Sequence, residues 1–311
     1  MAVTTSTQLA SDTLINYVTS EIKALEPMLL FTKLGVRRDV VKGFNKLTFP
    51  QGNQLNASSV STISSQGVNP SVTTWGTTAY SASLTQYGLI IQISDIALRN
   101  SAFELIQSGV LNVKNALARQ IDIALQSTLS AGTNVGYSGG KTARANLTAG
   151  DLIAVGDYTE GISLLRVAYT NSATPAGLQP FIDGKYAVIM DPKVESDFMN
   201  NTSAGAWMDL ARYDNTKRLE YGHIDGFRGG VVMTTANLTT FASTVTVYPT
   251  YYLGLESFGW GYFQQPEPVI IATPDSNNVL NLFTSIGAKA SVGSTLFEQQ
   301  RVYRTESARS S

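Results

Sequence analysis

"YGLIIQISDIALRNSAFELIQSGVLNVKNALARQIDIAL", residues 87–125, joins two different hydrophobic periods, and their order decides the fold. Apolar side chains first stand at every second position, which predicts a strand with one buried face: Tyr87, Leu89, Ile91 and Ile93. They then recur in steps of three and four, which predicts an amphipathic helix: Phe103, Ile106, Val110, Val113, Leu117, Ile121 and Ala124. We therefore expect a strand that leads into a long helix.

The expected helix carries a start signal and an end signal. Ser101 and Glu104 have the spacing of a capping box, in which each side chain binds a free backbone N–H of the first turn. Gly132 ends the periodic pattern, so about thirty residues rising about 1.5 Å each predict a helix about 45 Å long. The opposite face is polar and is expected to stay exposed: Gln107, Asn112, Lys114, Arg119 and Asp122.

Residues 47–86, which precede the strand, are rich in Ser, Thr, Asn, Gln and Gly and have too few apolar side chains to form a core. Disorder is one reading of such a composition. Their β-branched and aromatic residues favour strands, however, and Gly67 with Asn69-Pro70 marks a turn. We expect a long, exposed β-hairpin that needs a neighbouring surface, because two strands alone are only marginally stable in water.

The composition favours burial against another protein. Charged residues make up 14% of the chain, against about 25% in an ordinary soluble protein, while hydrophobic residues make up 43%. Neutral polar side chains fill the difference, although a low-charge secreted protein rich in strands would look similar. The chain has no Cys and one His, which excludes a disulfide framework or a thiol nucleophile and leaves little for metal binding. We expect no metal and no cofactor.

The sequence predicts neither export nor a membrane span. Residues 1–14 lack the basic start and apolar core of a secretory signal. The longest apolar runs, such as residues 269–272, are far shorter than the roughly 20 residues that a span requires. A net charge of −1 argues against a dedicated nucleic-acid binder. We expect a soluble, cytoplasmic chain.

"GYSGGKT", residues 136–142, matches two catalytic patterns. Ser138 stands where a hydrolase has its nucleophile, but that elbow needs a strand before it, and the long helix is expected there instead. A phosphate-binding loop needs Gly where this chain has Val135. A later acid and His223 would complete the hydrolase order, with these candidate acids: Asp191, Asp197 and Asp209. We expect no enzyme, with a serine hydrolase using Ser138 as the alternative.

The remaining patterns predict an arm and a set of shorter elements. Residues 1–46 form an arm with one amphipathic helix, and Thr148 with Asp151 opens a second helix. A strand at 185–190 is followed by a helix that Asp191-Pro192 starts. Further strands are expected at 231–233, 269–272, 279–288 and 300–304, and the tail at 306–311 is expected to be mobile.

This order of elements resembles the major capsid proteins of tailed bacteriophages, which have the Hong Kong 97-like (HK97-like) fold. Residues 87–125 resemble the strand and spine helix of the branch typified by phage N-four. Three later blocks resemble that branch as well: "YAVIMDPKVESDF" (186–198), "GHIDGFRGGVVMTT" (222–235) and "LNLFTSIGAKASVGSTLFEQQRVYRTES" (280–307). The resemblance covers nearly the whole chain in order.

The resemblance implies an α+β fold in four parts. Residues 1–46 would be the N-terminal arm, and residues 47–95 the extended β-hairpin loop with its strand. Residues 96–148 and 250–311 would form the peripheral domain with the long spine helix. Residues 149–249 would form the axial domain.

The resemblance also implies a structural role in the virion. Copies of such a chain tile as pentamers and hexamers into an icosahedral shell, assembled in the host bacterial cytoplasm around double-stranded DNA. The DNA would be contacted weakly and non-specifically, and scaffolding, portal and decoration proteins would be further partners. An encapsulin-like shell that stores an enzyme is the alternative within this fold.

The subunit contacts can be assigned to particular residues as expectations. The hairpin would lie across the peripheral domain of a neighbouring subunit, with Phe49, Trp75 and Tyr80 as anchors, because large aromatic side chains dominate many interfaces. The alternative is that they pack only within the hairpin. The ring axes of the shell, or else an ordinary core, would hold three residues of the axial domain: Trp207, Met208 and Tyr213. Arg37 and Arg38 would be a solvated pair or would face DNA.

Overall fold

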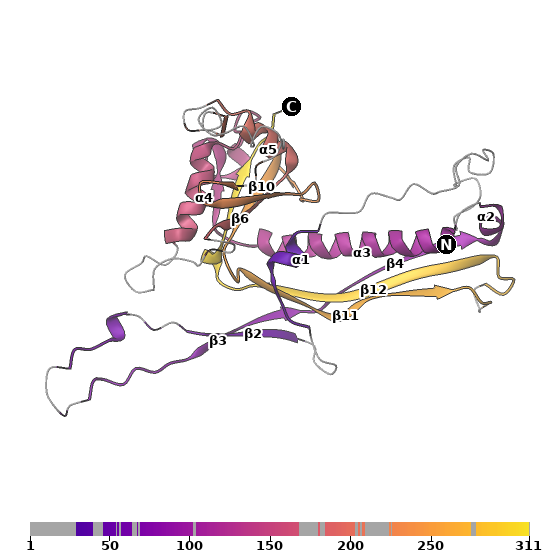
Figure 1. The fold of residues 1–311 in the computed structure, drawn as a ribbon, viewed down its shortest axis with the longest axis horizontal. Helices are drawn as coiled ribbons and strands as arrows, with labels where there is room; N and C mark the ends of the chain where they lie inside the picture. The colour runs from indigo at the N-terminus through magenta and orange to yellow at the C-terminus, as the bar shows by residue number, and fades with distance from the viewer. Residues whose placement is uncertain are drawn as a thin grey trace.

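The structure is a computed structural model, which describes residues 29–39, 46–53, 55, 57–63, 67, 69–101, 104–167, 180, 184–202, 205, 207–208, 224, 226–274 and 278–310. Most of the expected arm helix lies outside these residues, as do Phe103, Tyr213 and His223. The molecule is elongated. A long helix and a sheet run from a smaller α/β body toward one end of the long axis, and the hairpin extends toward the other end (Figure 1).

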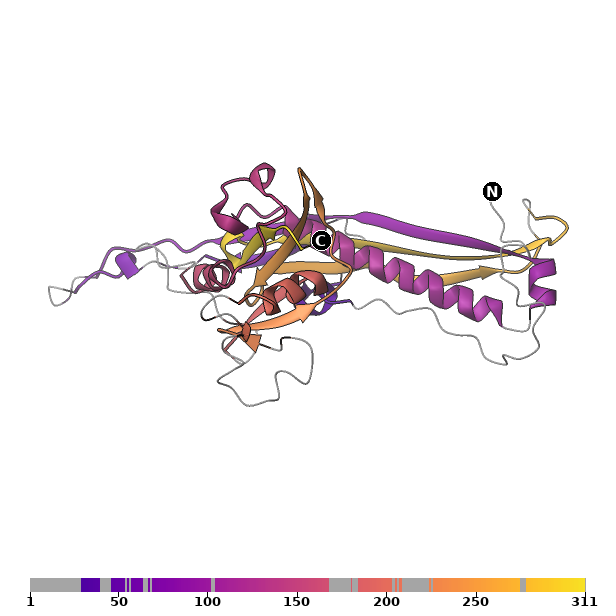
Figure 2. The same ribbon diagram turned by 90° about the horizontal axis from the view of Figure 1, so that it is seen from above.

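The long helix, α3 (Leu105–Ser130), lies along one face of a four-stranded sheet (Figure 2). The strand order is β1 (Val36–Arg37), β11 (Phe258–Ile271), β12 (Phe283–Leu296) and β4 (Thr85–Ser94). The helix buries a stripe at the predicted spacing, which includes Val113, Leu117 and Ile121, against the apolar face of β12. The predicted order of a strand followed by a long amphipathic helix is confirmed.

The predicted capping box at the start of this helix is wrong. A separate short helix, α2 (Asp95–Asn100), follows β4, and the Ser94 hydroxyl accepts a hydrogen bond from the Ala97 N–H at 3.2 Å. Ser101 is extended and ends α2, while Glu104 precedes α3 and makes no capping hydrogen bond with its side chain. The 26 residues of α3 therefore span about 39 Å at about 1.5 Å per residue, less than predicted.

Asp122 lies on the face of α3 that was expected to be exposed, and that expectation is wrong because its exposed fraction is 0%. Its Oδ1 accepts hydrogen bonds from the backbone N–H groups of Phe31 at 3.0 Å and Thr32 at 3.3 Å. These groups open the short helix α1 (Phe31–Leu34), whose first N–H groups have no partner within the helix. A buried carboxylate on α3 thus caps a helix far away in the sequence.

The smaller body is built on a second, seven-stranded sheet. Its order is β5 (Val135–Tyr137), β13 (Val302–Ser307), β10 (Thr246–Leu253), β6 (Tyr186–Met190), β8 (Gly230–Thr234) and β7 (Gly226–Phe227), and β9 (Phe241–Ala242) pairs with β10. The helices α4 (Val155–Val167) and α5 (Pro192–Met199) pack on it around a second core that includes Tyr158, Phe198 and Tyr252.

Several predicted elements of this body are confirmed. β6 and α5 lie where they were expected, and the Asp191 carboxylate accepts a hydrogen bond from the Lys193 N–H at 2.8 Å to cap α5. Thr148 and Asp151 form the predicted local pair, since Thr148 donates from its backbone N–H to Asp151 Oδ2 at 2.7 Å. That pair closes a turn before α4, however, because α4 begins only at Val155.

The expectation that residues 306–311 form a mobile tail is wrong for their first part, because the second sheet includes residues 306–307. Glu306 and Ser307 end strand β13, between β5 and β10, and both have an exposed fraction of 0%. Ala308 is also buried, and its N–H donates to the Asp151 carbonyl at 2.9 Å. The expectation failed because a short polar sequence does not reveal that its charge and backbone find partners inside the fold. The four-part division of the chain stays a prediction, and strands from both sides of residue 250 share this sheet.

The predicted hairpin is confirmed at its base. β2 (Lys46–Gly52) and β3 (Thr77–Ser83) form an antiparallel pair in continuous register. Between Asn53 and Gly76 the described residues include a short 3-10 turn, η1 (Ala57–Ser59), and form no strand, and the chain runs outward from the body (Figure 1). Gly67 has a φ of 79°, which a residue without a Cβ adopts at little cost.

Candidate functional site

Ser138, the hydrolase candidate, is buried. It opens the 3-10 turn η2 (Ser138–Gly140) and has an exposed fraction of 0%. The expectation that no strand precedes it is wrong, because β5 ends at Tyr137. A nucleophile elbow presents its hydroxyl to solvent and continues into a helix, whereas Ser138 is enclosed and continues into a single turn.

The described part of the chain contains neither a candidate metal site nor a candidate membrane span. It holds no group of three or more His, Cys, Asp or Glu residues placed to bind a metal ion. None of its helices is long and apolar enough to cross a membrane.

Two of the three predicted hairpin anchors lie inside their own chain. Phe49 has an exposed fraction of 5%, and its ring centroid lies 5.1 Å from that of Phe297, which directly follows β12. The Tyr80 ring centroid lies 5.6 Å from that of Phe297, and burial raises the pKa of the Tyr80 hydroxyl. Gly259 makes room for the cluster, because a Cβ there would lie 2.5 Å from the Phe49 ring. Phe49 and Tyr80 thus fix the base of the hairpin to the body.

Trp75, the third predicted anchor, is exposed but makes two contacts at the end of the β2–β3 pair. Its exposed fraction is 63%, and its Nε1–H donates to the Asn53 carbonyl at 2.7 Å. The ring lies against Gly52, where a Cβ would stand 2.6 Å from the Trp75 Cζ2 atom. Held from one side, Trp75 presents the remainder of its indole to solvent.

The outer part of the hairpin is both apolar and uncharged. Its exposed apolar side chains are Leu55, Val60, Ile63 and Val72, the last with an exposed fraction of 95%. The sequence has no charged residue between Lys46 and Asp95, a range that covers the hairpin and β4. Burying this surface against a partner therefore requires no charged group to lose its water.

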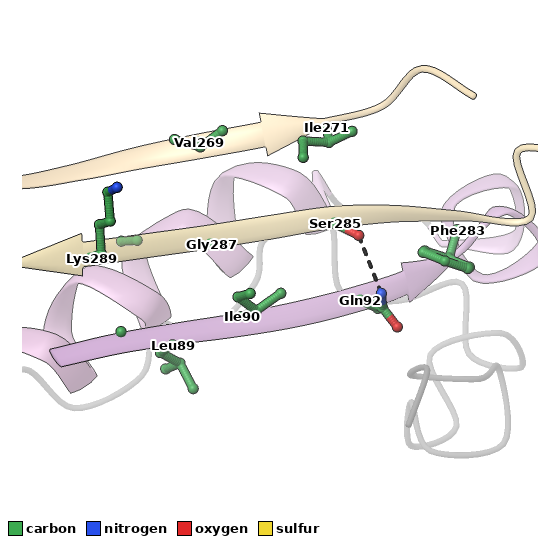
Figure 3. Close-up of a pocket in the computed structure, with 11 residues that line it drawn as sticks. Leu89, Ile90, Gln92, Val269, Ile271, Phe283, Ser285, Gly287 and Lys289 are labelled. Atoms are coloured by element: carbon green, nitrogen blue, oxygen red, sulfur yellow. Dashed lines mark hydrogen bonds between the residues drawn. The ribbon is translucent and has the colours of Figure 1, made fainter. Parts of the chain in front are cut away.

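A groove of about 750 Å³ runs over the four-stranded sheet on the face turned away from α3 (Figure 3). Ile90 of β4 and Val269 and Ile271 of β11 line it, and their exposed fractions are 72%, 53% and 43%. Gly287 of β12 keeps its floor low, because a Cβ there would lie 3.2 Å from Ile90 Cγ1. At one end Gln92 Nε2–H donates to Ser285 Oγ at 3.4 Å, and Lys289 brings the one charge to the lining.

This groove was not among the features predicted from the sequence, although a signal for it exists. Strict alternation would leave position 90 polar, yet Leu89, Ile90 and Ile91 are all apolar. Such a run indicates that a strand has an apolar residue on each face. Leu89 itself was expected to be buried, but it is 37% exposed, because α3 packs mainly over β12 rather than over the edge strand β4.

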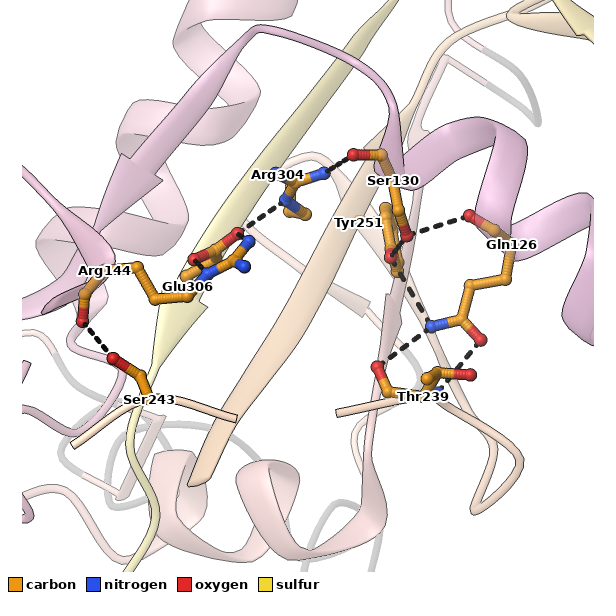
Figure 4. Close-up of polar contacts among 8 residues, drawn as sticks. All are labelled: Gln126, Ser130, Arg144, Thr239, Ser243, Tyr251, Arg304 and Glu306. Atoms are coloured by element: carbon orange, nitrogen blue, oxygen red, sulfur yellow. Dashed lines mark hydrogen bonds and ion pairs between the residues drawn. The ribbon is translucent and has the colours of Figure 1, made fainter. Parts of the chain in front are cut away.

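A buried polar network joins the end of α3 to the second sheet (Figure 4). Glu306 accepts two hydrogen bonds of 2.6 Å from Arg144 and one of 2.9 Å from Arg304. Arg304 also donates to the Ser130 carbonyl at the last turn of α3, where free carbonyl groups attract a cation. The hydrogen bond to Glu306 raises the pKa of Arg144 above its ordinary value. The network fixes the angle at which the long helix leaves the body.

The same network continues along the helix. Tyr251 of β10 places its hydroxyl 2.6 Å from Ser130 Oγ and accepts from Gln126 Nε2 at 3.4 Å (Figure 4). Burial raises the pKa of Tyr251. Gln126 Oε1 accepts from the Thr239 N–H at 3.0 Å, so that α3, β10 and the loop before β9 meet at one amide side chain.

The remaining predicted positions are distributed as follows. Trp207 has an exposed fraction of 5% and belongs to the second core, Met208 is half-buried, and Tyr213 lies outside the described residues. Arg37 forms an ion pair of 2.7 Å with Asp39, which lowers the pKa of that carboxyl. Arg38 lies over the Phe49 ring.

The comparisons with known proteins agree on one class. The family model described as "Phage capsid protein" matches residues 77–296. The capsid of Ralstonia phage GP4 matches with a TM-score of 0.71 and 13% identity, covering 96% of this chain and 95% of that one. The head of Helicobacter pylori bacteriophage KHP40 matches with a TM-score of 0.71 and 10% identity, covering 95% of each chain.

A third structure, from Mycobacterium phage Che8, has a TM-score of 0.65 and 14% identity, covering 93% of this chain and 95% of that one. No curated protein sequence matches the chain. At these identities the structural matches establish the fold, which is HK97-like, and the family model establishes the family.

Proposed function

The chain belongs to the phage capsid protein family, and from that premise we propose that its copies assemble as pentamers and hexamers into an icosahedral head. It is a structural major capsid protein of the virion. The head encloses the double-stranded DNA genome and is assembled in the cytoplasm of the host bacterium. The chain is not an enzyme, and the burial of Ser138 supports this reading.

The contact between subunits is made by the hairpin of one copy and the groove of the next. The observation that carries this proposal is the exposed, uncharged outer hairpin, in which Val72 is 95% exposed and Trp75 is 63% exposed. The groove is likewise apolar and exposed, and it is lined by Ile90, Val269 and Ile271. Subunits that join through two different surfaces close into rings when the rotation between them allows it.

Trp75 is the anchor of this contact, while Phe49 and Tyr80 act from within their own chain by holding the hairpin at a fixed angle. Each single contact is weak, with a dissociation constant of about a micromolar to a millimolar, so that misplaced subunits leave. Many contacts for each subunit then make the closed head durable.

The partners follow from the charge of the surface. A net charge of −1 supports only weak, non-specific contact with packaged DNA, because strong binding depends on neutralising many phosphates. Arg37 is paired with Asp39 and contributes little toward such contact. Scaffolding, portal and decoration proteins complete the head as separate chains. Trp207 belongs to the core of the smaller body, and with Met208 it would lie in the part of the subunit that surrounds the ring axes.

Negative-stain microscopy of the chain expressed alone and with its neighbouring phage genes tests the proposal. Closed particles of uniform size are expected, and mass spectrometry of the isolated particles should find nucleic acid. A cargo enzyme in place of nucleic acid would assign the shell to the encapsulin-like class instead. A subunit that stays monomeric under both conditions would refute the proposal.

A further inference from the structure

Strand β4 forms an open edge of the four-stranded sheet. Among the described residues it pairs with β12 alone, from Thr85 to Ser94, without a shift of register. Half of the backbone N–H and C=O groups of an edge strand point away from its partner and are free to bind another strand. β4 is therefore a template for one more strand.

The opposite edge of the same sheet is protected. Beyond Tyr262, β11 has two register shifts, and it carries Pro266, Glu267 and Pro268. Bulges, prolines and charges are the features by which proteins stop an edge from pairing, because a proline cannot donate a hydrogen bond and a charge resists burial. β4 has no proline, no charged residue and no bulge. One edge of the sheet is thus protected against pairing with another strand, and the other edge is open to it.

The chain also supplies a segment suited to the open edge. Residues 69–76 are exposed and have no strand partner among the described residues. Val72, Thr73 and Thr74 are β-branched and favour an extended backbone. Neither this segment nor β4 carries a charge, so that pairing them desolvates no ionic group.

The segment and the edge cannot meet within one subunit in this fold. The hairpin points away from the body at one end of the long axis, whereas β4 runs toward α2 at the other end (Figures 1 and 2). A second copy, placed head to tail, brings its hairpin to this edge. The same placement sets Trp75 beside the groove, because Ile90 belongs to β4 itself.

We infer that β4 receives residues 71–75 of a neighbouring copy as an added strand. The inference rests on the proposed function and deepens it, since the subunit contact becomes a shared sheet with backbone hydrogen bonds as well as a side-chain contact. In this form of recognition the main chain supplies affinity, and pockets for alternate side chains supply specificity.

Engineered cysteine pairs test the inference, and the natural chain is a clean background because it has no Cys. The double variants are T73C with Q86C and T73C with I90C, each made in the full chain and assembled into particles before mild oxidation. Adjacent strands bring Cα atoms to about 5.5 Å, which a disulfide spans. Most chains in at least one variant should run as cross-linked oligomers on a non-reducing gel.

The control pairs T73C with E267C, which stands on the protected edge of β11 and should give only the small background of the single variant T73C. Hydrogen exchange gives a second measurement, in which β4 amides should exchange more slowly in particles than in free subunits. Normal particles with no β4 cross-link and unchanged β4 exchange would overturn the inference and leave the proposed function standing. Failure to form particles with the unmodified chain would instead count against the proposed function.

Discussion

The guanidinium of Arg144 donates two hydrogen bonds of 2.6 Å to the carboxylate of Glu306, a residue 162 positions later in the chain. Arg304 binds the same carboxylate and the last turn of α3 together. The orientation of the long helix relative to the second sheet therefore depends on one buried acid. Removing it leaves two cationic side chains without their partner.

Replacing this acid should destabilise the subunit strongly. For Glu306→Gln we expect a loss of about 3 kcal/mol in the free energy of unfolding, because breaking a buried ion pair leaves an uncompensated charge. Urea unfolding of the unassembled subunit measures it. The control is Glu267→Gln, an exposed acid on β11, which should change the free energy by less than about 0.5 kcal/mol. Equal effects of the two changes would contradict the assignment.

Trp75→Ala should leave the subunit folded and prevent closed particles. The side chain is mostly exposed in the subunit, so its loss costs the fold little, but anchors of this kind contribute about 2 kcal/mol or more to an interface. Microscopy and the unfolding midpoint measure the two effects separately. Phe49→Ala is the contrasting variant, because it should lower the midpoint by emptying a buried site. Particles at normal yield from Trp75→Ala would remove the anchor role.

Ile90→Lys should act in the groove without affecting the fold. Position 90 is 72% exposed in the subunit, so a lysine there is tolerated, whereas a partner that covers the groove would have to bury its charge. We expect unchanged circular dichroism and a severe loss of particles. Leu111→Lys is the matched control, since it places the same charge at an exposed apolar position of α3 on the other face of the sheet. Loss of particles from both variants alike would mean that the groove has no special role.

Asp122 should make the stability of the subunit depend on pH. Burial raises the pKa of Asp122 above its usual 3.8, although backbone N–H groups from Leu30, Phe31 and Thr32 oppose the rise. A raised pKa in the folded state means that ionisation costs stability. The folded state therefore loses stability as the pH rises from the pKa of Asp122 in the unfolded chain through its higher pKa in the folded chain.

The variant Asp122→Asn keeps an acceptor oxygen for the same N–H groups and cannot ionise. The free energy of unfolding of this variant, minus that of the natural chain, should increase as the pH is raised from about 4 to about 7. Urea titrations at each pH measure the difference. A difference that does not change with pH would show that the buried carboxyl does not titrate in this range.

Ser138 should not react with a fluorophosphonate probe in the folded subunit. Its exposed fraction is 0%, so the phosphorus atom cannot approach the hydroxyl. Fluorescence of the protein band after incubation measures labelling, with Ser138→Ala as the blank. Labelling of the natural chain above that blank would reopen the hydrolase alternative.

The periodic parts of the sequence predicted the periodic parts of the fold. The steps of three and four placed Val113, Leu117 and Ile121 on the buried stripe of α3, and Asp191-Pro192 marked the start of α5. These signals are local, because a helix or strand repeats its environment every few residues.

The predictions were wrong at residues whose hydrogen-bond partners lie far away in the sequence. Asp122 reads as a surface residue on its own helix, and only the position of α1 shows that it is a cap. Glu306 reads as part of a polar tail until Arg144 and Arg304 are in place around it. Ser101 shows the related limit of a short motif, because it ends the separate helix α2, which Ser94 caps, and α3 begins only at Leu105.

The sequence predicted that the chain has an exposed hairpin, but it did not predict which residues of the subunit stay exposed. The polar composition of residues 47–86 indicated a hairpin in need of a partner, and Trp75 was found with it. Phe49 looked equivalent to Trp75 in the sequence, but the contact with Phe297 lies far beyond the range of any local pattern. The groove required three strands to be placed side by side before Ile90, Val269 and Ile271 could be seen together.

The uncharged stretch between Lys46 and Asp95 has a consequence for the effect of salt. Dissolved ions weaken attraction between charges over a Debye length of about 10 Å at 0.1 M, but they hardly weaken contacts between neutral surfaces. A contact made through this stretch, as proposed, would therefore change little in strength between dilute and concentrated salt solutions. The salt dependence of particle stability would then come from the charged surfaces elsewhere on the subunit.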